Sequence, residues 1–159
     1  MFFVCVYKKE NFSNIKSHIE GLRLRESDYI FFIIEETPCL NVRNLNPLLD
    51  IKPNVIFVYE NGKMDFSMCE LKSQQKWGST VLSIGGKIHF IEYGELLFLD
   101  NYSCLLYNVG KLGSSSYLRK EIRDKVNHLK YVDLLITNRG FERENTKGSS
   151  VSINDIKIS

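Results

Sequence analysis

The sequence predicts a single α+β domain, built from a mostly antiparallel or mixed β-sheet with two main helices. Three observations lead to this fold class. Candidate strands outnumber candidate helices, two segments carry apolar residues at helical spacing, and short Gly- or Asn-containing turns separate the later strands. Apolar residues make up 43% and charged residues 25%, as in ordinary globular chains. Because no change in composition divides the chain, we expect residues 1–159 to form one domain.

Two segments have the periodicity of amphipathic helices. In residues 13–24, Ile15, Ile19 and Leu22 fall on one face, and Ser13 occupies the N-cap position. The second segment, residues 115–130, has a longer apolar stripe made of Leu118, Ile122, Val126 and Leu129. We therefore expect one helix near the N-terminus and one in the last third of the chain.

The remaining apolar segments are expected to be strands. The segment at 29–34 is a continuous apolar run, which is typical of a buried strand, and the pattern of 132–137 also predicts a buried strand. The other strand candidates lie at 1–7, 54–60, 63–72, 80–84, 87–92, 95–99 and 103–109.

The segments between these elements are expected to be turns and loops. Gly85-Gly86 and Asp100-Asn101 separate neighbouring strand candidates, so the middle of the chain predicts an antiparallel meander. Residues 36–50 predict a loop with one helical turn. Residues 138–150 are polar and charged and predict a mobile loop, which a short edge strand follows over 151–158.

The clearest local signal is Asn61-Gly62, which lies between two β-prone runs. This dipeptide predicts a hairpin with a type I′ turn, because both central residues of that turn need a positive φ. A two-residue turn would pair Glu60 with Lys63 and place Pro53 opposite Glu70.

Residues 52–72 resemble the core hairpin of the PD-(D/E)xK nuclease superfamily. That family has Pro-Asp on one strand and Glu-x-Lys on the next; this chain has Pro53-Asn54 and Glu70-Leu71-Lys72. The resemblance implies a fold that cleaves DNA or RNA with Mg²⁺ or Mn²⁺, Glu70 as a metal ligand and Lys72 as the catalytic lysine. Asp65 and Asp50 are further candidate metal ligands, and the resemblance also allows an acid from a preceding helix, Glu20 or Glu26.

The predicted hairpin does not by itself assemble this metal site. Side chains alternate between the two faces of a strand, so Glu70 and Lys72 share one face while Asn54 and Asp65 lie on the other. A shared metal site would need a β-bulge that shifts one strand by a residue. The alternative is that Glu70 and Lys72 form a solvated strand end with no catalytic role.

A second, weaker resemblance involves residues 87–99, 104–110 and 132–137, which look like the first half of a metallo-β-lactamase-like domain. That family continues with a His-x-His-x-Asp-His zinc motif. This chain has Asn138-Arg139-Gly140-Phe141-Glu142-Arg143 there, with no histidine. The resemblance implies a degenerate relative that binds no zinc.

Four residues are candidates for contact with nucleic acid. Lys76 and Trp77 combine a cation with an aromatic ring, and Arg139 and Arg143 add charge in the late loop. The pattern favours a helical turn with Trp77 anchored in the core, and Glu142 and Glu144 favour a solvated late loop. The three isolated histidines, at 18, 89 and 128, are expected to be structural or superficial.

Charge and cysteine content set broader bounds. The formal net charge is +2, so composition indicates neither a strongly basic nor a strongly acidic partner. Four separated cysteines lie in or beside apolar runs, which favours buried, reduced thiols and a cytoplasmic or nuclear location; we expect no signal peptide and no membrane-spanning segment.

Two functional hypotheses remain. One is a metal-dependent nuclease, and the other is a non-catalytic protein-binding or adaptor module. Neither calls for a small-molecule cofactor.

Overall fold

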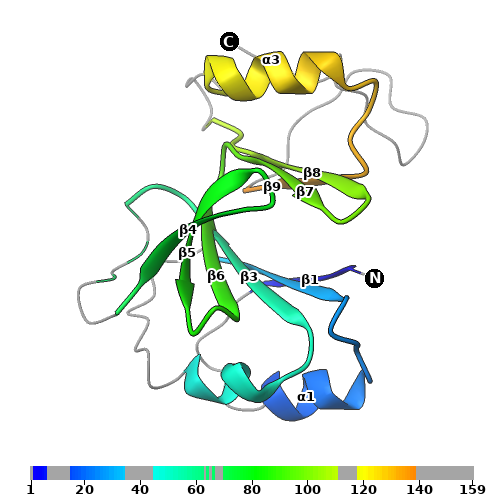
Figure 1. The fold of residues 1–159 in the computed structure, drawn as a ribbon, viewed down its shortest axis with the longest axis vertical. Coiled ribbons are helices and arrows are strands. Elements are labelled where there is room, and N and C mark those ends of the chain that lie inside the picture. Colours follow the sequence, from blue (N-terminus) through cyan, green and yellow to red (C-terminus); the bar gives the residue numbers. More distant parts are fainter. Residues whose placement is uncertain are drawn as a thin grey trace. The chain divides into compact units, whose positions relative to one another are not determined.

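A computed structural model of the chain describes residues 2–6, 15–34, 45–62, 64, 66, 70–110 and 118–138. Within these ranges the fold class is confirmed: nine strands form two mixed sheets, and the chain has two α-helices (Figure 1). The elements are β1 (Phe2–Val6), α1 (Ile15–Gly21), β2 (Tyr29–Ile33), the 3-10 helix η2 (Asn46–Asp50), β3 (Asn54–Tyr59), β4 (Lys72–Lys76), β5 (Ser79–Ile84), β6 (Ile88–Glu92), β7 (Leu96–Leu99), β8 (Tyr102–Tyr107), α3 (Lys120–His128) and β9 (Leu134–Thr137).

The chain divides into two compact units. The first contains residues 1–76 and 80–92, and the second contains residues 77–79 and 93–159. Each unit has its own sheet and its own apolar cluster. The expected late loop and edge strand lie outside the described residues, apart from Asn138.

The first unit contains a six-stranded sheet with the order β1-β2-β3-β6-β5-β4. Strands β1, β2, β3 and β6 run parallel to one another, and β5 is antiparallel to β6. All five residues of β2 are buried, and five of the six in β3. The continuous apolar run at 29–34 is therefore a central strand covered on both faces. The expectation of a buried strand at 132–137 is wrong, because β9 is an edge strand in which only Ile136 is buried.

A row of three phenylalanine rings crosses the middle of this sheet. Phe32 on β2, Phe57 on β3 and Phe90 on β6 are in register, and successive ring centroids are 4.9 and 5.3 Å apart. α1 covers the same face through Ile15 and Ile19 of the predicted stripe (Figure 1). Leu22, the third residue of that stripe, follows the helix and is exposed. Stacked rings on neighbouring strands bury a large apolar area at fixed spacing, so this row holds the strands in register.

The predicted hairpin between residues 54–60 and 63–72 is wrong. β3 has β2 on one edge and β6 on the other, both parallel to it, and Asn54 pairs with Tyr29. A strand has only two hydrogen-bonding edges, so no third strand can pair with β3. The Asn-Gly turn does form, but Gly62 has a φ of 80° and Asn61 does not share a positive φ, so the turn is not type I′.

The predicted Asp100-Asn101 turn is confirmed and joins the antiparallel strands β7 and β8 by two residues. A second two-residue turn, Trp77-Gly78, joins the neighbouring strands β4 and β5. Both residues have a positive φ, of 55° and 77°, as a type I′ turn requires. The sequence gives little sign of it, since a bulky residue rarely adopts this conformation. The predicted Gly85-Gly86 turn is confirmed, with φ values of 60° and 65° and a hydrogen bond from Lys87 N to Ile84 O.

The second unit is a three-stranded sheet with one helix. β7 and β8 are antiparallel, β8 and β9 are parallel, and α3 lies in the connection between β8 and β9 (Figure 1). The predicted stripe of the second helix packs on this sheet: the buried cluster includes Leu118, Ile122 and Val126 together with Leu96, Leu105 and Tyr107. The periodicity therefore identified the helix and its buried face, but α3 spans only Lys120–His128, and Leu118 packs on the sheet from just before the helix.

Two of the four cysteines are described, and both are free thiols. Cys104 on β8 is fully buried, and burial raises the pKa of its thiol to about 12. Cys5 on the edge strand β1 is exposed, which corrects the expectation that all the cysteines are buried. Cys39 and Cys69 lie outside the described residues.

Among the described helices, none combines the length and the apolar character needed to cross a bilayer.

The phenylalanine row makes a prediction about stability. Replacing Phe57 by Ala should lower the free energy of unfolding by about 3–5 kcal/mol, because it removes the central ring and leaves a cavity between two others. Urea unfolding followed by circular dichroism measures the change. Tyr131→Ala, at a position that is 68% exposed, is the control and should shift stability by less than about 0.5 kcal/mol. Equal losses in the two variants would contradict a structural role for the row.

Candidate functional site

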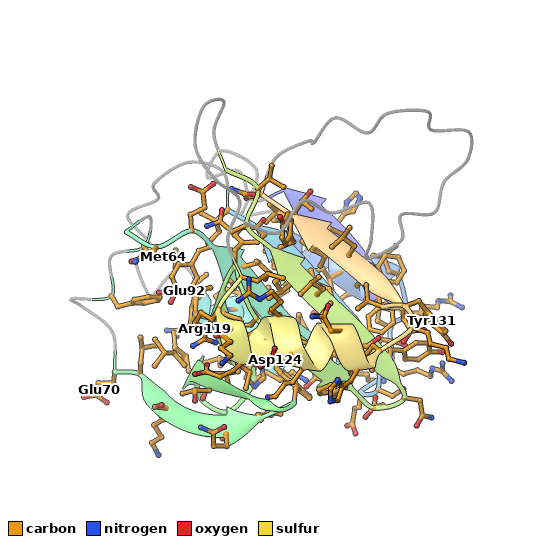
Figure 2. All side chains as sticks on the ribbon, turned by 90° about the horizontal axis from the view of Figure 1, so that it is seen from above. Met64, Glu70, Glu92, Arg119, Asp124 and Tyr131 are labelled. Atoms are coloured by element: carbon orange, nitrogen blue, oxygen red, sulfur yellow. The ribbon has the colours of Figure 1, made fainter. Side chains whose placement is uncertain are left out.

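The two residues at the centre of the nuclease-like motif lie at the edge of the first sheet. Glu70 precedes β4 and Lys72 begins it, and both side chains are exposed. Figure 2 shows Glu70 pointing away from the ribbon. Neither side chain has a hydrogen bond or ion pair within the described part of the chain. Asp65 lies outside the described residues, so its place relative to Glu70 stays a prediction.

Asp50 lies elsewhere in the first unit, at the end of η2, and forms an ion pair with Lys16. Lys16 Nζ is 3.9 Å from Asp50 Oδ2 and 3.9 Å from Glu20 Oε1. Asp50, Glu20 and Glu26 all line one pocket, so the structure does bring these acids into one region. The described residues nevertheless contain no group of three His, Cys, Asp or Glu side chains arranged to hold a metal ion. Lys16 supplies positive charge to two of these acids.

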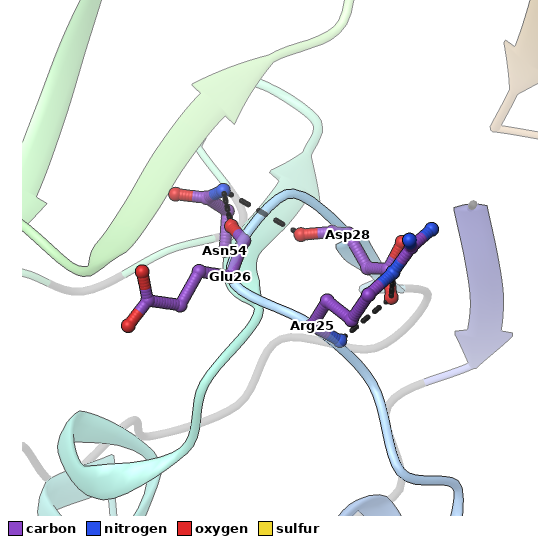
Figure 3. A network of polar contacts seen from close by, with 4 residues as sticks. All are labelled: Arg25, Glu26, Asp28 and Asn54. Atoms are coloured by element: carbon purple, nitrogen blue, oxygen red, sulfur yellow. Dashed lines mark hydrogen bonds and ion pairs between the residues drawn. The ribbon is translucent and has the colours of Figure 1, made fainter.

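Asn54, at the position of the family's metal-binding aspartate, has a structural role. Its Nδ2 donates to Glu26 O at 3.1 Å and to Asp28 O at 3.5 Å (Figure 3). Both acceptors are backbone carbonyls in the loop before β2. A carboxylate cannot donate a hydrogen bond, so these contacts require the amide. Asn54 therefore ties β3 to this loop as a donor, which is the opposite of what a metal ligand does.

Asp28 fixes the same loop from inside. The backbone N–H of Arg25 donates to Asp28 Oδ2 at 2.7 Å, and Asp28 N donates back to Arg25 O at 3.0 Å (Figure 3). The bond from Arg25 favours the charged carboxylate and lowers the pKa of Asp28. Residues 25–28 are thus held both internally and by β3.

Of the four residues expected to contact nucleic acid, two are described. Lys76 is half-buried, and its Nζ lies 3.3 Å from His89 Nε2. Trp77 is half-buried in the β4–β5 turn, where its carbonyl accepts a hydrogen bond from Phe98 N at 2.9 Å. The helical turn expected around Trp77 is therefore wrong. Arg139 and Arg143 lie outside the described residues.

His89 is fully buried, as its expected structural role requires. Its Nδ1 lies 3.1 Å from Val55 O, and because a carbonyl only accepts, the ring proton sits on Nδ1. Nε2 then accepts from the Lys76 ammonium. Burial, and the positive charge of Lys76, lower the pKa of His89 to about 4. The imidazole is therefore neutral at physiological pH.

Asn138, where the metallo-β-lactamase-like family begins its zinc motif, also serves as a structural residue. Its Oδ1 accepts from Val109 N at 2.6 Å, and its Nδ2 donates to Asn108 Oδ1 at 2.9 Å and to Val109 O at 3.1 Å. These bonds join the carboxyl ends of the parallel strands β8 and β9. The side-chain amide here links strands, and both of its polar atoms are engaged.

A second pocket, which the sequence analysis did not identify, lies in the second unit. It has a volume of about 430 Å³ and lies between the β7–β8 turn and the segment that follows α3. Its lining includes Phe98, Tyr102 and Tyr131, which are 41%, 49% and 68% exposed. In Figure 2, Tyr131 lies beyond the C-terminal end of α3. We call these three residues and their pocket the aromatic pocket.

A pair of side chains holds the two walls of the aromatic pocket together. Asp133 Oδ2 accepts from Ser103 N at 2.7 Å and from Ser103 Oγ at 3.1 Å. Asp133 N donates back to Ser103 O at 3.0 Å. Ser103 lies on β8 and Asp133 just precedes β9, so the pocket is built on a fixed frame.

The sequence holds no signal for these exposed rings. β7 reads Leu-Leu-Phe-Leu, and of these four apolar residues only Phe98 faces solvent. Apolar residues at every position predict a strand buried on both faces. Which of the four is exposed depends on what covers each face of the folded sheet.

Comparison with known proteins yields no match: no family model, curated protein or solved structure is significantly similar to this chain. Both family resemblances therefore stay predictions, and the functional argument depends on the geometry.

The role of Asn54 can be tested by Asn54→Asp. This variant places a carboxylate against two carbonyl oxygens and removes two donated hydrogen bonds, so we expect a loss of about 1–3 kcal/mol in the free energy of unfolding. Urea unfolding with and without about 5 mM Mg²⁺ measures the loss and any stabilisation by the metal. If the introduced carboxylate instead formed the missing half of a metal site, Mg²⁺ would stabilise the variant and not the wild type.

Burial of neutral His89 predicts a pH dependence of stability. The unfolded state has the ordinary pKa near 6.5 and the folded state a pKa of about 4, so the unfolded state binds more protons between these values. Stability should therefore fall as the pH is lowered from about 6.5 to about 4, by a loss on the order of 3 kcal/mol. Comparing denaturant unfolding of wild type and His89→Gln over this range isolates the effect from titrating carboxylates. A slope as steep in His89→Gln as in the wild type would contradict the assignment.

Proposed function

We propose that the chain is a non-catalytic protein-binding module, and that the aromatic pocket is its docking site. The observation that carries this proposal is the clustering of exposed aromatic rings. The structure describes five exposed large hydrophobic residues, and three of them, Phe98, Tyr102 and Tyr131, line this one pocket.

Exposed aromatic rings in a cluster are characteristic of binding surfaces. Solitary exposed apolar side chains are common on any protein, whereas Tyr and Phe gathered around a concavity are enriched at interfaces and supply much of the binding energy. The volume of about 430 Å³ suits one or two side chains of a partner. We therefore expect the partner to insert an apolar anchor side chain.

The frame around the pocket supports the same function. The Ser103–Asp133 contacts hold both walls, so less conformational freedom is lost when a partner binds. Asp100, His128 and Lys130 also line the pocket and provide polar groups of both signs at its rim. A partner anchor flanked by polar groups fits this rim.

The hypothesis of a nuclease rests on the motif alone. The carboxylates Asp50 and Glu20 lie against Lys16, and Asn54 donates to carbonyls, so the described acids do not favour a metal site. Action inside the cell, as expected from the sequence, is part of the proposal.

Binding can be tested without a known partner. Peptides selected from a random displayed library against the purified chain should bind the wild type and bind Tyr102→Ala and Tyr131→Ala at least about ten-fold more weakly, because these side chains line the pocket. Fluorescence polarisation measures the affinities. Leu22→Ala, at an exposed apolar residue outside the pocket, is the matched control and should bind like the wild type.

Two results would overturn the proposal. One is that no peptide is enriched, or that selected peptides bind the tyrosine variants as tightly as the wild type. The other is degradation of DNA or RNA in Mg²⁺ or Mn²⁺ that Lys72→Ala abolishes, which would establish the nuclease instead.

A further inference from the structure

The pocket that Glu20, Glu26 and Asp50 share lies in the first unit, at the amino ends of β2 and β3. Its volume is about 880 Å³, within the range of small-molecule sites. Its apolar lining residues, Ile19, Leu24, Ile51 and Pro53, are buried, and its charged lining residues are exposed. The pocket therefore has an apolar floor and a charged rim; we call it the charged pocket.

The rim contains equal numbers of acidic and basic side chains, but they differ in whether they lie near a group of opposite charge. Lys16 accompanies Glu20 and Asp50, and Arg25 Nε lies 3.9 Å from Asp28 Oδ2. Arg23 and Lys52 have no ion pair or hydrogen bond to their charged groups within the described residues. The remaining rim acid, Glu26, lies near Lys87; burial lowers the pKa of Lys87, and the negative charge of Glu26 opposes that shift in part. Two cations thus remain available at the rim.

The backbone of Arg23 is unusual. Arg23 follows α1 with a φ of 53°, in the left-handed region that glycine normally occupies after a helix. Arg23 N donates to Glu20 O at 3.2 Å, which closes the last turn of α1. Gly21 is the last residue of α1, but the residue with the left-handed backbone conformation is Arg23, at the rim of the pocket. Strain of this kind is concentrated at binding sites.

The walls of the charged pocket are fixed. Asn54 and Asp28 hold residues 25–28, and Lys87 Nζ donates to Lys52 O and so holds the loop before β3. A ligand that enters would meet a preformed site.

We propose that the charged pocket binds a small phosphate monoester with an apolar substituent. The dianionic phosphate matches the two available cations, and the arginine can form paired hydrogen bonds to its oxygens. The apolar substituent would cover Ile19, Leu24 and Ile51. This site is independent of the aromatic pocket, since it lies in the other unit.

Thermal unfolding with inorganic phosphate, phenyl phosphate and benzoate at constant ionic strength tests the proposal. Phenyl phosphate should raise the midpoint saturably and reach half-saturation at a concentration at least about five-fold lower than inorganic phosphate, because its ring buries apolar area. Benzoate, with one charge, should bind more weakly than phenyl phosphate. Lys52→Ala should weaken phenyl phosphate binding about ten-fold.

Arg23→Gly separates binding from folding. Glycine adopts the left-handed conformation without strain, so this variant should unfold about 2 °C higher than the wild type in the absence of ligand. It should nevertheless bind phenyl phosphate about ten-fold more weakly. Lys120→Ala, which removes an exposed cation from α3 in the second unit, should bind as the wild type does.

Three outcomes would overturn the proposal. The first is an equal response to phenyl phosphate in the wild type and Arg23→Gly. The second is the absence of any saturable shift with phenyl phosphate. The third is benzoate binding as tight as that of phenyl phosphate, which would exclude a dianion as the recognised group.

Discussion

The parallel pairing of β3 on both of its edges is the constraint on which the first unit depends. β2 and β6 occupy the two edges, and the stacked rings of Phe32, Phe57 and Phe90 hold the three strands in register. This arrangement leaves the described residues between β3 and β4, which are 60–62, 64, 66, 70 and 71, outside the sheet. It also puts Lys72 on an edge strand. It also brings the amino end of β3 beside the loop before β2, where Asn54 reaches two carbonyls.

Three polar side chains at or beside the positions expected for metal ligands have structural roles. Asn54 donates to carbonyls, Asn138 both donates and accepts across β8 and β9, and Lys16 lies between two carboxylates. Asn54 uses the amide as a donor, which a carboxylate cannot be, and Asn138 uses both the donor and the acceptor of its amide. Polar groups at strand ends therefore need not indicate catalysis.

The two pockets share one physical principle, which is preorganisation. In each, short side-chain-to-backbone hydrogen bonds fix the loops that form the walls: Asp28 and Asn54 in the charged pocket, Ser103 and Asp133 in the aromatic pocket. The exposed groups at the rims differ, with available cations in one and aromatic rings in the other. Fixed walls lower the entropic cost of binding, and the exposed groups decide which ligand is recognised.

The sequence by itself determined the type and order of most elements. Apolar spacing predicted α1 and α3, a continuous apolar run predicted β2, and Gly85-Gly86 predicted a turn, because each of these depends on interactions within a few residues. Only the tertiary structure decided that β3 pairs with β2 and β6 rather than with the segment after Asn61-Gly62. It also decided that Phe98 faces solvent while its neighbours are buried. Strand partners and the covering of each face depend on residues distant in sequence, and no local pattern encodes those contacts.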